Sequence, residues 1–185
     1  MPHASDRMSS AAQSRRREPL DLTDVEAVAF VCSGNMVRSA FAELYGRHQG
    51  LACPHLSLGT TYRNPALHPR TRAELLQAGL APATLDAFRP THVEDLSASS
   101  RALLTNEGTL VLGMTEAHLE QLDGSCGHAR LHLMEELRGR REPIPDPVLD
   151  PVSYEQTFSR LRACLEPLLQ HFQPADSRVS KGLPR

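Results

Sequence analysis

The sequence predicts one α/β domain built around a parallel β-sheet. Residues 25–32 form a nearly unbroken apolar run, which is typical of a central parallel strand that is covered on both faces. Stretches with apolar residues at helical spacing follow this run and later strand candidates, so strand and helix signals alternate along the chain. Ligands of such sheets bind at the carboxyl ends of the strands, so the residues that follow each strand are the candidates for chemistry.

Length and composition agree with this prediction. The chain has 185 residues, of which 40% are hydrophobic, enough for one sizeable core. The net charge of -2 gives no reason to expect nucleic acid or an anionic membrane as a partner, and no apolar run approaches the length that crosses a bilayer. The four cysteines lie far apart without a CxxC pair, which favours reduced thiols in a cytoplasmic protein.

Both ends of the chain differ from the middle. Residues 1–24 include the polar stretch SSAAQSRRREP and have no periodic apolar pattern, so we predict a disordered tail. Asp6 and Glu18 interrupt the positive charge that a transit peptide would carry. Residues 173–185 are predicted to form a flexible C-terminal tail. The folded domain is expected to span residues 25–172.

The first half of the domain predicts two strand–helix units. After the strand at 25–32, apolar residues recur at helical spacing from Ser39, and Gly50 marks the end of this helix. A second strand is predicted at 55–60. The helix predicted over 69–79 has proline at its start and glycine at its end, the usual preference at helix termini.

The second half predicts two further strands and two helices. A strand at 109–114 is followed by a helix over 115–122, and residues 129–134 alternate as an edge strand does. The final helix, 154–172, has the clearest spacing of apolar residues and is followed by the C-terminal tail.

Two features mark the course of the final helix. Ser153 and Gln156 have the spacing of a capping box, so the helix is expected to start there. Pro167 lies inside the apolar pattern and is expected to kink or fray the last turns.

The loop after the first strand carries the strongest chemical signal. Cys32 ends the strand, and residues 33–37 lead into a helix that begins near Arg38. Backbone N–H groups of such a loop and of the first helical turn can all point at one anion, and they favour a thiolate. The planar guanidinium of Arg38 matches two oxygens of a phosphate. A thiolate beside a bound phosphate predicts in-line attack of sulfur on phosphorus.

The other loop residues suit the same role. Gly34 and Asn35 tolerate the left-handed backbone that a tight loop needs, and Ser39 is placed to donate a hydrogen bond to the thiolate. No GKS or GKT sequence is present in this region, so the loop is not of the nucleotide-binding kind. The residues predicted to bind phosphate are Ser33, Gly34, Asn35, Met36, Val37, Arg38 and Ser39.

Transfer of a phosphoryl group also requires a proton donor for the leaving atom. The segment EPIPDPVLDP, residues 142–151, offers Asp146 and Asp150, each followed by a proline that stiffens the loop. Because Asp-Pro is also a common loop dipeptide, the residues alone leave the choice open.

Together these residues carry a resemblance to the low-molecular-weight protein tyrosine phosphatases. The family signature is C-x-G-N-x-C-R-S near the N-terminus with an Asp-Pro near the C-terminus, and here the signature stands as CSGNMVRS at 32–39. Further similar segments follow in the family's order: SLGT (57–60), HPRT (68–71), LVLGMTEAHLEQL (110–122) and IPDP (144–147). The similarity covers essentially the whole predicted domain.

The resemblance implies a four-stranded parallel sheet flanked by helices, a flavodoxin-like three-layer sandwich. It implies a phosphatase that acts on phosphomonoesters through a phosphocysteine on Cys32, with Arg38 holding the phosphate and no metal or other cofactor. The family's final helix begins several residues after its Asp-Pro. Asp146 leaves seven positions before Tyr154, whereas Asp150 leaves almost no loop. Asp146 is therefore expected to be the general acid, and Asp150 a turn or cap residue.

Three departures from the family pattern bear on function. Val37 replaces the family's second cysteine, and Phe88 stands where many members have a histidine that buttresses the loop. Val148 and Leu149 stand where phosphotyrosine-directed members place aromatic residues at the pocket mouth. The expected substrate is a phosphorylated protein or a small phosphomonoester, phosphotyrosine first and phosphoarginine as the alternative, and phosphate or sulfate is expected to occupy the loop.

Two other function classes stay open. An arsenate reductase of similar fold has the same oxyanion loop, but its thioredoxin-coupled form needs two further cysteines close in sequence. Cys53, Cys126 and Cys164 are too widely spaced to resemble that pair. A phosphate-binding regulatory module without catalysis is the second class. A zinc site at Cys126, His128 and His132 lacks an evident fourth ligand, so no metal is expected.

Overall fold

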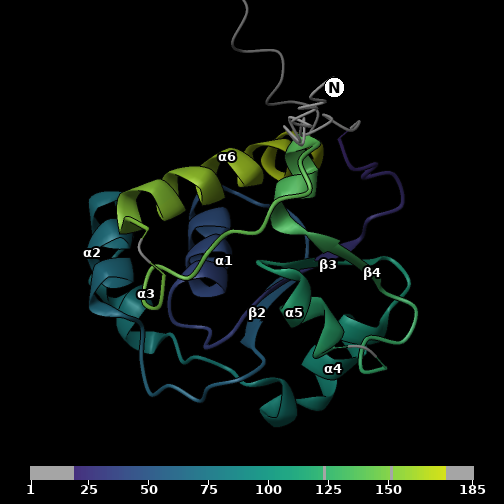
Figure 1. The fold of residues 1–185 in the computed structure, drawn as a ribbon, viewed down its shortest axis with the longest axis horizontal. Coiled ribbons are helices and arrows are strands. Elements are labelled where there is room, and N and C mark those ends of the chain that lie inside the picture. The colour runs from purple at the N-terminus through teal and green to yellow at the C-terminus, as the bar shows by residue number, and fades with distance from the viewer. Residues whose placement is uncertain (1–18, 123, 151, 174–185) are drawn as a thin grey trace, which may run out of the picture.

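A computed structural model describes residues 19–122, 124–150 and 152–173 of the chain. Its centre is a four-stranded sheet in the order β2-β1-β3-β4, and every neighbouring pair runs parallel (Figure 1). The strands are β1 (Ala27–Cys32), β2 (His55–Gly59), β3 (Thr109–Gly113) and β4 (Arg130–Leu133). The predicted four-stranded parallel sheet is confirmed, and β4 lies at an edge as its alternating pattern indicated.

Helices cover both faces of the sheet and make the three-layer arrangement visible in Figure 1. On one face lie α1 (Arg38–His48), α2 (Pro69–Gln77), α3 (Pro82–Ala87) and α6 (Tyr154–Phe172). On the other lie α4 (Ala98–Thr105) and α5 (Glu116–Glu120). Alternate residues of β1 explain the division, because Phe30 belongs to the first core and Val31 to the second.

The helices predicted after β1, β2 and β3 are confirmed, although the one after β3 ends at Glu120. Ser153 begins α6 as expected, since its Oγ accepts the backbone N–H of Gln156 at 3.0 Å. Helix α6 continues through Pro167 to Phe172, so the proline does not end it.

Four short elements were not predicted from the sequence. They are α3, α4 and the 3₁₀ turns η1 (Val93–Asp95) and η2 (Met134–Arg138). Helix α3 buries only Leu85, and α4 buries only Leu104, so neither has the apolar stripe that marks a helix in a sequence.

The N-terminal boundary differs from the expected one. Residues 1–18 of the predicted tail lie outside the described residues, but residues 19–24 lie against the domain. The backbone N–H of Leu20 donates to the carbonyl of Glu136 at 3.2 Å, and Leu20 and Leu22 pack on the larger core. Of the predicted C-terminal tail, residues 174–185 lie outside the described part. Among the described helices none is long and apolar enough to cross a membrane.

The register brings the carboxyl ends of all the strands to one edge. Cys32 pairs with Gly59, while Val31 pairs with Gly113, which in turn pairs with Leu133. The loops after β1 and β2 and the segment after η2 therefore meet above this edge, where the sequence places Cys32 and Asp146.

Candidate active site

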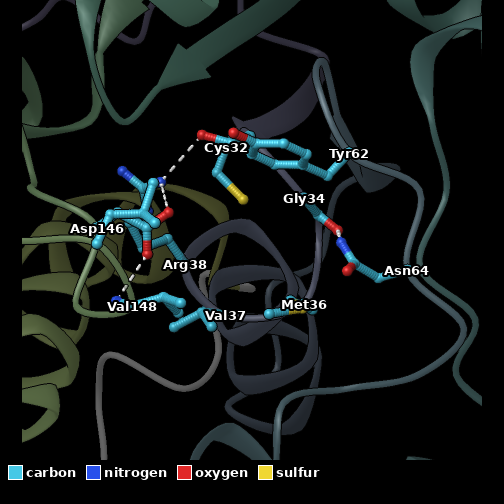
Figure 2. Close-up of a pocket in the computed structure, with 11 residues that line it drawn as sticks. Cys32, Gly34, Met36, Val37, Arg38, Tyr62, Asn64, Asp146 and Val148 are labelled. Carbon is cyan, nitrogen blue, oxygen red and sulfur yellow. Dashed lines mark hydrogen bonds and ion pairs between the residues drawn. The ribbon is translucent and has the colours of Figure 1, made fainter.

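A small cavity of about 70 Å³ lies at this edge (Figure 2). Figure 2 shows the sulfur of Cys32 turned into it, with Arg38 and Asp146 on one side and Tyr62 and Asn64 on the other. The lining residues are Cys32, Ser33, Gly34, Met36, Val37, Arg38, Tyr62, Asn64, Asp146, Val148 and Leu149. The structure thus brings the predicted nucleophile, the predicted phosphate-binding arginine and the predicted acid into one cavity.

We call residues 32–39 the thiol loop. Asn35 stands at its turn with φ of 50°, in the left-handed region that asparagine tolerates better than most residues. Its side chain is fully buried and completely paired: Nδ2 donates to Ser39 Oγ at 3.0 Å and to Ser57 Oγ at 2.7 Å, and Oδ1 accepts the Thr91 N–H at 2.8 Å. Neither Asn35 nor Ser39 lines the cavity, so their side chains support the loop, and their predicted part in binding phosphate stays a prediction.

The support extends into helix α1. Ser57 Oγ donates to the carboxylate of Glu43 at 2.5 Å, and the other oxygen of Glu43 pairs with Arg47. Glu43 is buried, and Arg47, one turn further along the helix, forms an ion pair with its carboxylate. The sequence analysis missed Glu43, and the only signal available was the Glu-Arg spacing of four residues within the helix.

Glycine is required where β2 meets the thiol loop. A Cβ atom on Gly59 would lie 3.0 Å from the Gly34 carbonyl carbon and 3.1 Å from both Asn35 N and Ser33 O. These are backbone atoms that cannot rotate away. On the outer side, Asn64 Nδ2 donates to the Gly34 carbonyl at 2.7 Å, so the loop is held from both sides.

Cys32 is buried, and its Sγ lies 3.0 Å from Ser39 Oγ, as the sequence analysis expected. The Ser39 hydroxyl also lies 3.3 Å from the Leu58 carbonyl. Because Asn35 donates to this hydroxyl, the Ser39 proton is left for the sulfur or for the carbonyl. The Ser39 hydroxyl is therefore placed within hydrogen-bonding distance of the Cys32 sulfur.

Arg38 is almost fully buried at the base of the cavity. Its NH1 donates to the Ile144 carbonyl at 2.9 Å, and its NH2 donates to Asp146 Oδ2 at 2.6 Å and to Ser33 Oγ at 3.3 Å. Among the described residues its Nε has no hydrogen-bond partner. A buried guanidinium with an unsatisfied N–H beside a cavity fits an oxyanion bound there.

The loop that carries Asp146, residues 144–150, is held by its own turn. Asp146 Oδ1 accepts the Val148 N–H at 3.1 Å, and Asp150 Oδ2 accepts the Asp146 N–H at 2.8 Å. Asp146 faces the cavity through its contact with Arg38, whereas Asp150 bonds the backbone of the turn. Asp146 therefore lines the cavity and Asp150 supports the turn, and the assignment of Asp146 as the general acid stays a prediction.

A histidine that the sequence analysis did not single out contacts the thiol loop. His118 of α5 is buried, and its Nε2 lies 2.9 Å from Ser33 Oγ. Burial, with a smaller effect from the Arg38 charge, lowers the pKa of His118 to about 4. Its place three residues after Thr115, at the start of a predicted helix, was the available signal.

The other predicted candidates lie away from the cavity. Burial raises the pKa of Cys53 to about 11 and that of Cys164 to about 12. His132 Nδ1 lies 2.8 Å from Glu136 Oε2. In the described part of the chain no three His, Cys, Asp or Glu side chains are placed to hold a metal ion.

The sequence matches no protein-family model and no curated protein. Solved structures, however, share its architecture over nearly their whole length. A low-molecular-weight protein tyrosine phosphatase from Streptococcus pyogenes is 17% identical, with a TM-score of 0.63 over 84% of this chain and 98% of that one. The YwlE arginine phosphatase from Geobacillus stearothermophilus is 20% identical, with a TM-score of 0.62 over 86% and 99%. The fold is that of the low-molecular-weight phosphatases.

A third structure with this fold is a YwlE arginine phosphatase in which serine replaces cysteine and the active-site serine is phosphorylated. It is 21% identical to this chain, with a TM-score of 0.62 over 82% of this chain and 98% of that one.

The structure shows the surroundings of the residues that depart from the phosphatase pattern. Phe88 packs against the core, and the Asn35 side chain is fully hydrogen-bonded without a histidine there. Val37 is buried in the cavity wall. Val148 and Leu149 are exposed and line the cavity, and Tyr62 lies across from Val148, so an aromatic ring reaches the cavity from the loop after β2 (Figure 2).

Proposed function

We propose that this protein is a phosphatase that hydrolyses phosphomonoesters through a phosphocysteine intermediate on Cys32. One observation carries the proposal: the buried guanidinium of Arg38 has no partner for its Nε within the described residues, beside a cavity that also holds the Cys32 thiol and the Asp146 carboxyl. An oxyanion satisfies this cation, and phosphorus bound there lies within reach of both a nucleophile and an acid.

The first step forms the intermediate. The thiolate of Cys32 attacks phosphorus, the sulfur–phosphorus bond forms, and the bond from phosphorus to the leaving oxygen breaks. Asp146 gives its proton to that oxygen, so the alcohol leaves neutral. Arg38 and the N–H groups of the thiol loop stabilise the charge that develops on the phosphoryl oxygens. A phosphorylated serine at the active site of a structure with this fold supports phosphoryl transfer at this position.

In the second step water attacks the phosphocysteine. Asp146, now a carboxylate, takes a proton from the water, the sulfur–phosphorus bond breaks, and inorganic phosphate and the Cys32 thiolate are released. No step requires a metal or an organic cofactor.

The ion pair between Arg38 and Asp146 links binding of the substrate to release of the acid. NH2 of Arg38 donates to Asp146 Oδ2 at 2.6 Å. A bound phosphoryl group brings oxygens to Nε and competes for NH2, because both are anionic partners of one guanidinium. Asp146 is then released from Arg38, takes up from solvent the proton that it later donates, and can face the leaving oxygen.

The cavity mouth supports an aromatic or planar leaving group. Tyr62 is 54% exposed and Leu149 is 69% exposed, and both line the cavity. We assign protein phosphotyrosine as the first candidate substrate, since its ring can pack against Tyr62. Phosphoarginine is the second, because a planar guanidinium can also stack on an aromatic face. We place the protein in the cytoplasm, because its four cysteines are widely spaced and do not form the pattern of a disulfide framework.

Hydrolysis across matched peptides bearing phosphotyrosine, phosphoserine or phosphoarginine tests this proposal. The expected order places phosphotyrosine first, and Cys32→Ser should abolish turnover while inorganic phosphate or vanadate still binds. Cys53→Ser serves as the matched control and should keep its activity. Substantial turnover by Cys32→Ser would overturn the mechanism.

The two alternatives predict different outcomes. A reductant-coupled assay with arsenate should show no reduction, because the raised pKa values of Cys53 and Cys164 keep both thiols protonated and poorly suited to relay a disulfide. A regulatory module would bind phosphate without hydrolysing any of the three peptides.

A further inference from the structure

The tautomer of His118 is fixed by its neighbours. The backbone N–H of Thr115 donates to Nδ1 of His118 at 3.1 Å, and the Thr115 hydroxyl lies 3.1 Å from the same nitrogen. Nδ1 is therefore an acceptor and carries no proton. A neutral imidazole then carries its proton on Nε2, so Nε2 donates to Ser33 Oγ across the 2.9 Å contact.

The donor from His118 determines where the Ser33 hydroxyl proton can go. A serine oxygen has two lone pairs and one proton. One lone pair accepts from His118 Nε2 at 2.9 Å, and the other accepts from Arg38 NH2 at 3.3 Å. Among the described residues the structure gives Ser33 Oγ no third partner, and Ser33 lines the cavity that contains Cys32. The remaining O–H must therefore donate into the cavity.

We propose that His118 is a positioning residue that makes the Ser33 hydroxyl a fixed hydrogen-bond donor for an oxyanion bound above Cys32. His118 touches neither the cavity nor the predicted reacting atoms, so it acts only through Ser33. Its part in catalysis rests on the proposed function, but its part in anion binding does not.

The positioning role requires that the imidazole ring of His118 is neutral. A protonated His118 would place a second cation beside the buried Arg38 and would have to donate from Nδ1, where the Thr115 N–H already points. The neutral ring instead supplies one donor without added charge. The alternative role is a purely structural one, in which the ring only caps the first turn of α5.

Binding of inorganic phosphate, measured by calorimetry, separates the two roles. Ser33→Ala removes the donor and should weaken binding by roughly ten-fold, the usual loss for a hydrogen bond to a charged group. Ser33→Thr retains the hydroxyl and should stay close to the wild type. His118→Phe lets the Ser33 hydroxyl turn away, so binding should weaken several-fold. His132→Phe is the matched control and should bind phosphate as the wild type does.

A variant that combines both substitutions distinguishes the positioning role of His118 from a purely structural one. Because His118 acts through Ser33, Ser33→Ala combined with His118→Phe should bind phosphate as Ser33→Ala alone does. If the two losses multiply, or if His118→Phe loses stability without losing phosphate affinity, the role is structural and the proposal is wrong.

A nuclear magnetic resonance measurement covers the case in which His118→Phe does not fold. In the wild type, the ring nitrogens of His118 should show a proton on Nε2 and none on Nδ1 at neutral pH. A proton on Nδ1 would overturn the inference. These measurements need no turnover, so they can succeed even if the peptide assays show that the protein is not a phosphatase.

Discussion

The two halves of the candidate active site are held in different ways. The thiol loop is fixed from behind by buried side chains, since Asn35 and Ser39 have no exposed surface and both polar side-chain atoms of Asn35 are paired. The loop of Asp146 is exposed at Val148 and Leu149, and its aspartate reaches the cavity through one ion pair with Arg38. The proposed anion site is thus held in place by the fold itself, whereas the proposed acid depends on a contact that a bound phosphoryl group is expected to disrupt.

The largest effect expected from this contrast is loss of all activity on oxidation of Cys32. An accessible thiolate is oxidised by peroxide to sulfenic acid and then irreversibly further, unless a second thiol traps the first product. None of the other three cysteines is placed to form a disulfide with Cys32. Strand β2 runs from His55 to Gly59, the partner of Cys32, so its four steps of about 3.3 Å span roughly 13 Å, and Cys53 precedes its far end, well beyond disulfide geometry. Cys126 belongs to the core on the other face of the sheet, and the raised pKa of Cys164 leaves it unreactive.

Peroxide should therefore inactivate the protein with poor recovery in dithiothreitol, and bound phosphate should slow the loss by covering the sulfur. Mass spectrometry should find sulfinic or sulfonic acid on Cys32. A disulfide between Cys32 and any other cysteine, or full recovery after prolonged exposure, would show that the thiol loop opens far more than its packing indicates.

The next effect concerns the exposed half of the site. Asp146→Asn should slow hydrolysis of esters with poor leaving groups by ~10²–10⁴-fold and that of activated aryl esters much less, because only poor leaving groups need the proton. Phosphate should still bind, since the change removes an anion that competes for Arg38.

Asp150→Asn is the matched control for Asp146→Asn. Asp150 bonds the backbone N–H of Asp146, so its loss should loosen the turn and slow both kinds of ester by a similar, smaller factor. If the dependence on the leaving group appears in Asp150→Asn and not in Asp146→Asn, the assignment of the acid is wrong.

The same contrast explains which parts of the site could be predicted from the sequence. Cys32 and Arg38 lie in one contiguous motif between a buried strand and a helix, so local signals sufficed. Asp146 was separated from Asp150 only by the resemblance and by loop length. The supporting residues Glu43 and His118 were missed because their partners, Ser57 and Ser33, come from distant segments that only the folded sheet brings together.

The fold shows a similar limit. The strands were predicted because β1 and β3 are buried along their whole length and read as apolar runs. Helices α3 and α4 were not, because each buries a single leucine and tertiary contacts rather than periodicity place them. The predicted start of the domain at residue 25 excludes Leu20 and Leu22 for a related reason. These leucines lie in a polar segment without apolar periodicity, and only the folded structure shows that they pack on the core.

A smaller effect is expected where β2 supports the thiol loop. Gly59→Ala places a methyl group 3.0 to 3.1 Å from backbone atoms of the loop, so the loop must move. We expect a stability cost of about 1–3 kcal/mol, typical of overpacking, and a clear fall in kcat/KM as the anion site is displaced.

Gly108→Ala is the control for crowding alone. The added methyl group would meet Glu26, 2.9 Å away, but this is a side chain that can turn aside. Gly108 directly precedes β3, at the end of the sheet opposite to the cavity. Gly108→Ala should keep full activity. Equal losses of activity in the two variants would mean that the thiol loop is not as tightly fitted as its contacts indicate.

The smallest effect links the support of the thiol loop to the stability of the domain. Burial lowers the pKa of His118 to about 4, whereas in the unfolded chain a histidine titrates near 6.5. Between these values the unfolded state binds the extra proton and the folded state does not, so stability falls as the pH drops below about 6.5 and is retained above it. By pH 5.5 this should cost the wild type about 1 kcal/mol relative to pH 7.5, as measured by urea unfolding. His118→Phe should lose that part of the pH dependence, while His132→Phe should keep it. If the pH dependence of stability is unchanged in His118→Phe, the ring is not held neutral by its burial, and the rigid half of the site is less well isolated from water than its packing indicates.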